Sequence, residues 1–258
     1  MHIVASLAIA FSFFTVFPTP NVEWTPSRLR YVIPAMPVVG AVIGLLGAFL
    51  FNALRFWQVS HVFGAVLMTL FYPAVTGGLH MDGLMDTCDA VFSRKERQER
   101  LGILSDTHVG AFAVLGCAAV LMMKAGIFSE LFTDYHQYVA SSYVFSLLLV
   151  LIPVYSRLGL GLLFFLPFAK EDGLARTLGA ARVFRDHIGF LATYALLGAA
   201  VLPLGLKWIF VPLTGSVVLV IYRSYCVKNF GGITGDLMGA YIELSELSMF
   251  LVLTIVRR

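Results

Sequence analysis

The stretch YVIPAMPVVGAVIGLLGAFLFNAL, residues Tyr31–Leu54, decides the fold of this protein. It contains no charged residue. A helix rises 1.5 Å per residue, so about 20 apolar residues cross a hydrocarbon core of about 30 Å. Gly40, Gly44 and Ala48 recur at helical spacing inside it, and small residues at that spacing let helices pack closely in lipid. The stretch therefore predicts a membrane-spanning helix that packs against a neighbour.

Five further stretches have the length and composition of a transmembrane helix. They are Val62–Leu79, Val109–Phe128, Tyr138–Leu166, His187–Leu206 and Trp208–Cys226. A seventh and weaker candidate, Gly235–Val256, carries Glu243 and Glu246 inside an otherwise apolar run. Ile3–Phe17 is apolar but short, which leaves open whether it crosses the membrane, re-enters it or lies in the interface.

The overall composition points the same way. Hydrophobic residues make up 59% of the 258 residues and charged residues 13%, with a mean hydropathy of +0.86. A soluble domain carries about 25% charged residues, so an ordinary soluble protein is excluded. The net charge of +3 is modest and its basic residues are spread out, which argues against a nucleic-acid partner. We predict an all-α, polytopic integral membrane helix bundle of about 6–8 transmembrane helices, with one membrane-embedded domain over residues 1–258.

Lysine and arginine are distributed unevenly between the two sides of the predicted bundle. If the segment after Leu79 faces the cytoplasm, twelve of them lie on that side, five on the far side and Arg157 within a span. The five are Arg55, Lys124, Lys207, Arg257 and Arg258. Because cytoplasmic loops carry the excess of positive charge, the split predicts that the segment after Leu79 faces the cytoplasm.

The motif HMDGLMDTCD follows directly on an apolar span and carries three carboxylates. Asp82, Asp86 and Asp89 are spaced i, i+4, i+7, which puts them on one face of a helix. Carboxylates held so close repel one another, and a divalent cation turns that repulsion into ligation. Hard oxygen ligands suit Mg²⁺, with Mn²⁺ as the alternative. Gly83 permits a close backbone approach, so we expect a metal site at the membrane–water boundary rather than three ordinary interfacial acids.

The second acidic motif, GGITGDLMGA, opens the weak seventh span. Its glycines and Thr234 are suited to a turn at a helix N-terminus, where free N–H groups bind phosphate. Gly235 and Asp236 follow, and Asp236 shares a helix face with Glu243, while Glu246 lies about 80° round from it. Ionisable groups in a span usually line a polar cavity or meet a cation. Packing glycines with a proton-coupled carboxylate pair would produce the same pattern.

Four other polar residues are candidates for substrate binding. His80 is suited to contact a phosphate, or it is a hydrogen-bonded interfacial histidine. Asp106 is a possible fourth carboxylate after the basic segment that ends at Arg100. Arg157 must meet an anion or reach water from inside an apolar run. Lys170 begins a basic loop that could clamp a diphosphate or simply follow the positive-inside bias.

These residues predict a metal-assisted reaction on a phosphorylated substrate at the cytoplasmic face, because displacement at phosphorus requires charge neutralisation on the phosphoryl oxygens. Two alternatives stay open. One is a cation-coupled secondary transporter, whose pathway would be Asp82, Asp86, Arg157, Asp236 and Glu243. The absence of a recognisable repeat and the clustering of acids at a helix end argue against it. The other is a membrane enzyme that joins a nucleotide-activated headgroup to a lipid alcohol.

Several stretches together resemble one known family, the adenosylcobinamide-GDP ribazoletransferases, also called cobalamin synthases or cobalamin 5′-phosphate synthases. They are FFTVFPTP at Phe13–Pro20, TGGLHMDGLMDTCDAVF at Thr76–Phe92, RKERQERLGILSDTHVGAFA at Arg94–Ala113, Arg157, AKEDGLA at Ala169–Ala175 and GGITGDLMGAYIELSE at Gly231–Glu246. The resemblance covers nearly the whole chain. The family is also distantly similar to the CDP-alcohol phosphotransferases, whose usual DG-x-x-AR pattern is not present after Asp82.

The resemblance implies the last assembly step of adenosylcobalamin. The ribose hydroxyl of α-ribazole, or of its 5′-phosphate, attacks adenosylcobinamide-GDP, and GMP leaves. It implies Mg²⁺, a bacterial cytoplasmic (inner) membrane with the site facing the cytoplasm, and corrinoid and nucleoside substrates, and it leaves a homo-oligomer open. The metal ligands would be Asp82, Asp86, Asp89 and Asp236. The catalytic residues would be Asp82, Asp86, Glu243 and Glu246, one of the two glutamates acting as base or supporting group. The substrate-binding residues would be His80, Asp106, Arg157, Lys170, Thr234 and Gly235.

Overall fold

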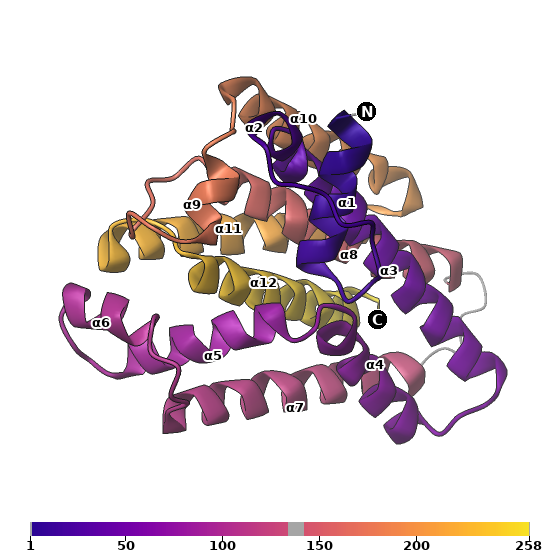
Figure 1. Ribbon diagram of the computed structural model, residues 1–258. Coiled ribbons are helices and arrows are strands. Elements are labelled where there is room, and N and C mark those ends of the chain that lie inside the picture. The colour runs from indigo at the N-terminus through magenta and orange to yellow at the C-terminus, as the bar shows by residue number, and fades with distance from the viewer. Residues whose placement is uncertain (1, 134–141, 258) are drawn as a thin grey trace.

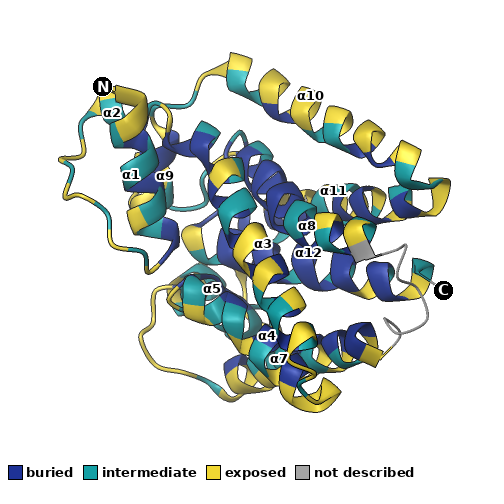
Figure 2. Cartoon of the chain, turned by 90° about the vertical axis from the view of Figure 1, so that its right-hand side faces the viewer, coloured by how far each residue is buried: buried dark blue, intermediate teal, exposed yellow. Residues whose placement is uncertain are grey.

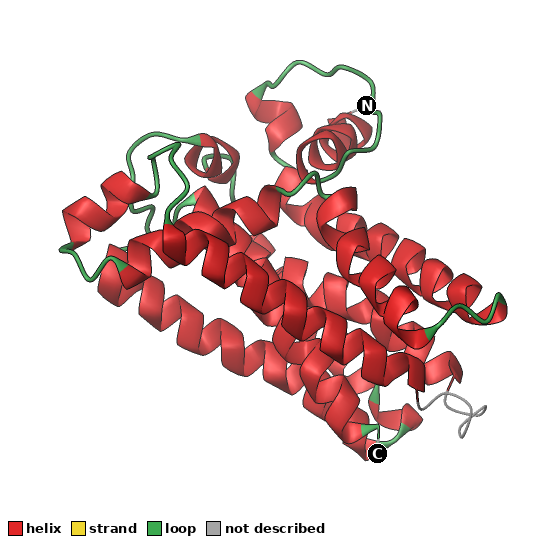
Figure 3. Cartoon of the chain, turned by 90° about the horizontal axis from the view of Figure 1, so that it is seen from below, coloured by secondary structure: helices red, strands yellow, loops and turns green. Residues whose placement is uncertain are grey.

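The first predicted span forms α3 (Val32–Phe56), which is long and apolar enough to cross a membrane. The structure, a computed structural model, describes residues 2–133 and 142–257. Within these ranges the chain is helical and forms no strand, apart from one isolated bridge between Phe168 and Ile233. Figure 3 shows the helices joined by loops that gather mainly at the ends of the bundle. The predicted all-α class is confirmed.

Six helices of the described part of the chain could each span a bilayer, so this is a multi-pass membrane protein. They are α3, α7 (Ala111–Thr133), α8 (Ser142–Leu163), α10 (Phe184–Ala200, continued by the 3-10 turn η3, Leu202–Leu204), α11 (Phe210–Phe230, preceded by η4, Leu206–Ile209) and α12 (Gly235–Val256). Six of the seven predicted spans correspond to them. Residues 138–141 of the predicted span Tyr138–Leu166 lie outside the described ranges.

The predicted span Val62–Leu79 is wrong as a single straight helix. The chain forms α4 (His61–Val75) and then α5 (Leu79–Phe92), bent by 91° relative to each other. Gly77 and Gly78 make the bend, with φ of +62° and +78°. Only glycine adopts this left-handed backbone at no steric cost, and the Gly78 amide donates to the carbonyl of Pro73 at 2.8 Å. The two helices together can count as a seventh, broken span.

The remaining helices are short. They are α1 (His2–Phe14), α2 (Pro26–Leu29), α6 (Arg97–Ile103) and α9 (Leu174–Gly179). α1 is apolar and has 13 residues, fewer than the roughly 17–25 of a span, and it packs on α3. Ser6 of α1 donates a hydrogen bond to the backbone carbonyl of Arg28, which ties α1 to α2.

α8 and α12 are the most deeply buried of the six spans, and α10 is the least. α3 packs closely on α8 because Gly44 has no side chain: a Cβ there would lie 2.7 Å from the Cα of Val150, as the small-residue pattern predicts. Figure 1 shows α5, α7 and α12 running side by side. This arrangement brings both acidic motifs to neighbouring helices.

Candidate active site

The two acidic motifs meet where α5 crosses the beginning of α12. A Cβ on Gly83 of α5 would lie 2.7 Å from the carbonyl oxygen and 3.0 Å from the Cα of Asp236. One turn along, a Cβ on Gly239 of α12 would lie 3.2 Å from the carbonyl oxygen of His80. The predicted close approach at Gly83 is therefore confirmed, and the backbones of the two helices touch.

A cavity of about 300 Å³ opens at this crossing, lined by α1, α5, α8, α9, the loop before α9 and the start of α12. Asp82 and Asp236 both line it. Asp86, one turn beyond Asp82 and half-buried, lies within electrostatic range of Asp82, Asp236 and Lys170. The structure thus brings Asp236 to Asp82 and Asp86, from which the chain separates it by about 150 residues.

Asp89, the third acid of the first motif, has its own partners. Its two carboxylate oxygens accept hydrogen bonds from the backbone amides of Gly110, at 2.7 Å, and Ala113, at 2.9 Å. These amides stand at the start of α7, where four N–H groups lack an intrahelical partner and the helix dipole favours an anion. Asp89 therefore caps α7 and joins it to α5. Its predicted role as a metal ligand stays a prediction.

The polar turn before α12 is built as the sequence predicts. Thr234 is the N-cap of α12, and its side-chain oxygen accepts a hydrogen bond from the amide of Leu237 at 3.3 Å. Thr234 and Gly235 both line the cavity, and outside its own helix turn no described residue comes within 4 Å of where a Cβ on Gly235 would be. Gly232 is needed for a different reason, because a Cβ there would collide with the backbone carbonyl of Pro167.

That close contact holds the segment before Lys170 against the turn that precedes α12. The amide of Ile233 donates to the carbonyl of Pro167, and the amide of Ala169 donates to the carbonyl of Ile233, both at 2.9 Å. Lys170 follows immediately and lines the cavity, and its Nζ donates to the Ser105 hydroxyl at 2.6 Å. Its charge acts on Asp86 and Asp236. Lys170 therefore lies beside the acids, and its predicted role in binding a diphosphate stays a prediction.

Aromatic side chains form the other wall of the cavity. Phe13 and Phe14 come from α1, Phe164 and Phe168 from the end of α8 and the loop that follows. Sequence reasoning did not assign these residues to the site, although Phe13 and Phe14 lie in a quoted motif. An apolar residue inside an apolar segment carries no signal that separates a cavity wall from a lipid-facing or core position.

His80 lies between the aromatic wall and the acids. It lines the cavity but is 3% exposed, and its ring centroid is 6.2 Å from that of Phe14. Its Nε2 has no hydrogen-bond partner among the described residues. Most buried polar atoms have one, so a ligand in the cavity is a suitable partner for this nitrogen.

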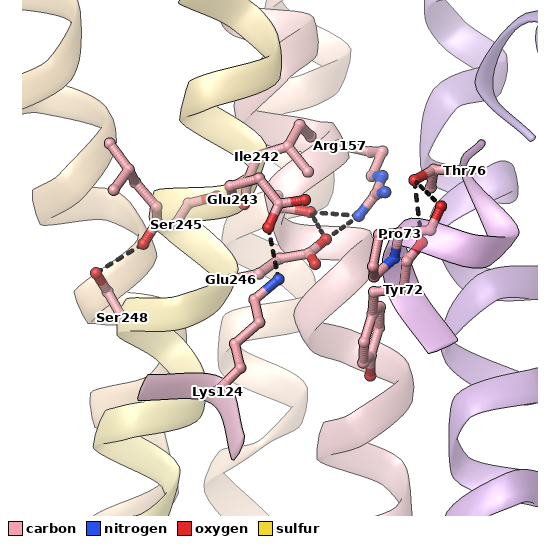
Figure 4. A network of polar contacts seen from close by, with 12 residues as sticks. Tyr72, Pro73, Thr76, Lys124, Arg157, Ile242, Glu243, Ser245, Glu246 and Ser248 are labelled. Atoms are coloured by element: carbon pink, nitrogen blue, oxygen red, sulfur yellow. Dashed lines mark hydrogen bonds and ion pairs between the residues drawn. The ribbon is translucent and has the colours of Figure 1, made fainter. Parts of the chain in front are cut away.

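Glu243, Glu246 and Arg157 are not among the residues that line the cavity. They form two ion pairs two or more turns deeper along α12, shown in Figure 4. Lys124 of α7 donates to Glu243 Oε2 at 2.6 Å, and its side chain is fully buried. Arg157 of α8 pairs with Glu246, whose Oε1 also accepts from Ser156 at 2.8 Å. The catalytic and substrate-binding roles of these residues stay predictions.

Lys124 is the partner that sequence reasoning missed. The charge count assigned it to the far side of the membrane, whereas the structure buries it in the middle of α7. A lysine within an otherwise apolar helix is itself a signal for a buried counter-charge. The sequence does not say which of the two glutamates provides it.

Asp106 is exposed and lies outside the cavity lining. It accepts hydrogen bonds from His108, at 2.6 Å from the ring Nδ1 and 3.0 Å from the amide. The side-chain bond, followed by the backbone bond, lowers the pKa of Asp106. Its role as a fourth carboxylate stays a prediction, because these contacts do not bring Asp106 to the other acids.

No three His, Cys, Asp or Glu side chains in residues 2–133 and 142–257 lie close enough together to hold a metal ion as they stand. The donors themselves fit Mg²⁺, since Asp82, Asp86 and Asp236 present hard carboxylate oxygens from two touching helices. Each side chain can turn toward the others by rotation about its χ angles. The backbone geometry therefore suits a shared cation.

Comparisons with known proteins identify the family to which the chain is similar. Residues 6–254 match the family described as cobalamin-5-phosphate synthase. The chain is 34% identical to an adenosylcobinamide-GDP ribazoletransferase from Geobacillus thermodenitrificans, over 92% of this chain and 90% of the relative. It is 30% identical to the protein of that name from Clostridium perfringens, over 97% and 98%, and 28% identical to that from Clostridium botulinum, over 95% of both chains. No solved structure matches the chain.

Proposed function

The chain belongs to the cobalamin-5-phosphate synthase family, and we propose that it transfers adenosylcobinamide phosphate from adenosylcobinamide-GDP to α-ribazole or α-ribazole 5′-phosphate, with release of GMP. It is a multi-pass membrane transferase of cobalamin biosynthesis. The observation that carries the detailed reaction is the contact between Gly83 and Asp236, which joins both acidic motifs at one cavity. A displacement at phosphorus needs such a concentration of charged groups.

Asp82, Asp86 and Asp236 would hold Mg²⁺, or Mn²⁺ in its place. When bound, the metal neutralises negative charge on the phosphoryl oxygens and helps to orient the attacking and leaving groups. The chain contributes the remaining contacts. Lys170 and Arg176 both line the cavity, so they are placed to bind the diphosphate and balance its charge.

The cavity suits the smaller substrate. Its volume of about 300 Å³ is at the lower end of the range for small-molecule sites, which is about 300–1,000 Å³. The phenyl rings of Phe14 and Phe164 offer apolar faces to the flat benzimidazole base of α-ribazole. His80 Nε2 then has a polar group of the nucleoside within reach, and the much larger corrinoid remains outside the cavity, with its diphosphate at the acids.

The ion pairs bear on the identity of the base. Glu243 and Glu246 each carry a cationic partner, Lys124 and Arg157 respectively, and a base needs a free lone pair within reach of the substrate hydroxyl. We therefore assign them the supporting role, in which they hold α12 between α7 and α8. The orientation that faces the cavity toward the cytoplasm rests on the excess of Lys and Arg on that side, in the inner membrane of a bacterium.

The test is a reconstituted assay. The purified protein in lipid vesicles receives adenosylcobinamide-GDP, α-ribazole and Mg²⁺, and GMP and the cobalamin product are followed by chromatography. We expect both products in equal amounts, and formation of each slowed more than about a hundredfold in the Asp82→Asn variant. Folded wild-type protein that makes neither product would overturn the proposal. Metal-dependent uptake of a solute into the vesicles without GMP release would favour the transporter instead.

A further inference from the structure

A second cavity of about 480 Å³ lies between α8, α10 and α11, on the opposite side of α8 from the first. Its walls are apolar, with Leu163 of α8, Leu191 of α10 and Leu219 of α11 among them. Two of the lining residues are not apolar, His187 of α10 and Arg223 of α11. None of the described residues that line it is acidic. We call this cavity the α10–α11 groove.

Two contacts fix the position of α10 beside the groove. Three residues beyond Leu191, the Tyr194 hydroxyl donates to the carbonyl of Pro212 at 2.9 Å, and it occupies the space of a side chain at Gly215. The first turn of α10 is tied elsewhere, because Asp186 accepts two hydrogen bonds from Arg30, at 2.6 and 3.1 Å. α10 therefore meets α11 at Tyr194, and toward its N-terminus it is held by α2.

Packing on α8 sets the depth of the groove. Phe190 rests on Gly161, where a Cβ would lie 2.7 Å from the phenyl ring. The rest of α10 is largely exposed, as Figure 2 shows. A preformed apolar groove between two transmembrane helices opens into lipid. Contact of its apolar side chains with water would be unfavourable.

The charged end of the groove faces the boundary of the membrane. Arg223 is exposed and lies seven residues before the end of α11 at Phe230, about 10 Å along the helix. α12 and its turn follow directly, so Arg223 is on the same side of the membrane as the candidate active site. The His187 ring packs between those of Phe165 and Phe184, with centroids 5.0 and 5.9 Å away, which orients its polar edge.

We propose that the α10–α11 groove is a binding site for one anionic phospholipid. The phosphate contacts Arg223 and the His187 ring, and an acyl chain lies along Leu163, Leu191 and Leu219. Basic pockets between transmembrane helices on the cytoplasmic side suit anionic headgroups. The described lining has no acidic residue and includes Arg223. It therefore favours a headgroup with a net negative charge over a zwitterionic one. Lipid binding in this groove does not require the proposed reaction.

The lipid would also support the active site. The end of α8 and the turn that follows it form a wall shared by both cavities: Phe164 lines the first cavity, while Leu163 and Phe165 line the groove. Filling the groove supports this wall from behind. We therefore expect the lipid to raise the thermal stability of the whole bundle and to keep Phe164 in place.

The experiment compares phosphatidylglycerol with phosphatidylcholine of identical acyl chains, added to delipidated protein in detergent. Thermal unfolding reports stabilisation, and native mass spectrometry counts retained phospholipid. We expect phosphatidylglycerol to raise the unfolding temperature by several degrees more than phosphatidylcholine. Arg223→Gln should weaken phosphatidylglycerol binding about fivefold, the effect of one surface arginine on an anionic lipid. Lys228→Gln removes the same charge from the same helix outside the groove, and it should keep the preference.

A second variant tests the apolar part. Val220 is exposed and lines the groove, so Val220→Trp fills it without disturbing buried packing. We expect this variant to fold and to retain less phospholipid. An equal response to both lipids in the wild type, or a phosphatidylglycerol preference that survives Arg223→Gln, would overturn the proposal. So would a dimer of the wild type that dissociates in Val220→Trp, because the groove would then bind a second copy of the chain.

Discussion

Gly83 of α5 lies against the backbone of Asp236 at the start of α12, so closely that a Cβ would be 2.7 Å from the Asp236 carbonyl oxygen. Real Cβ atoms do not approach an oxygen so closely, and the oxygen belongs to the backbone and cannot swing away. The distance between the two acidic motifs therefore depends on a missing side chain.

Gly83→Ala should separate α5 from α12 and lower kcat at least about tenfold, since a shift of about 1 Å in a catalytic group costs that much or more. Gly126→Ala is the matched control, because Gly126 also lies within a helix and, beyond that helix, no residue of the described ranges comes within 4 Å of its Cβ position. Steady-state kinetics and thermal unfolding of both variants check this. Equal activity in the two would show that the contact does not position the acids.

Asp82→Asn and Asp236→Asn should each lower turnover more than about a hundredfold, because the loss of a direct metal ligand exceeds the 10–100-fold effect of an outer partner. Both variants should also bind Mn²⁺ more weakly, measured by the paramagnetic resonance signal of the free ion. Glu99→Gln, an exposed acid on α6 paired with Lys95, is the control and should match the wild type. Unchanged Mn²⁺ binding in both aspartate variants would refute the metal assignment.

Lys124→Met should destabilise the protein by about 3–5 kcal/mol, because it leaves Glu243 buried without its cation. The double variant Lys124→Met/Glu243→Met should recover most of that loss, since an apolar pair needs no compensation in the interior. Unfolding in a denaturing detergent measures the stability of the single and the double variant. Lys95→Met breaks an exposed pair at 3.6 Å and should cost no more than about 1 kcal/mol.

The same double variant tests the role of Glu243. Turnover near the wild-type value in the double variant would show that Glu243 supports the fold and is not the base. Loss of turnover in a double variant whose stability has recovered would contradict the supporting role and favour catalysis by Glu243.

Substitutions of two cavity residues, Phe164 and Lys170, should change the KM values of different substrates. Phe164→Ala should raise the KM for α-ribazole up to about tenfold, the contribution of an aromatic contact, and leave the KM for adenosylcobinamide-GDP near its original value. Lys170→Gln should do the reverse, because a charged hydrogen bond to phosphate contributes about 1.5–3 kcal/mol. Kinetics with each substrate varied in turn separate them. Phe56→Ala, at a residue that is 84% exposed, is the control. A rise in both KM values for either cavity variant would place both substrates at one subsite.

The sequence predicted most of the fold because the helical signal is local. Tyr31–Leu54 needs only its own apolar side chains and the thickness of a bilayer to become α3. The failure at Val62–Leu79 has a local cause too, in the pair Gly77 and Gly78. Hydropathy averages over the bend, because glycine is apolar enough to extend an apolar run while its backbone ends the helix.

The sequence by itself determined that the protein is a membrane helix bundle with carboxylates in two motifs, because composition and helical spacing are properties of short segments. Only the tertiary structure decided what each carboxylate contacts. Asp82 and Asp236 face a cavity, Asp89 caps α7, and Glu243 meets a lysine 119 positions away in the chain. Three carboxylates on one helix face look alike in sequence. Asp82 and Asp86 lie near the start of α12, whereas Asp89 meets the start of α7, and that difference depends on packing between segments far apart in the chain.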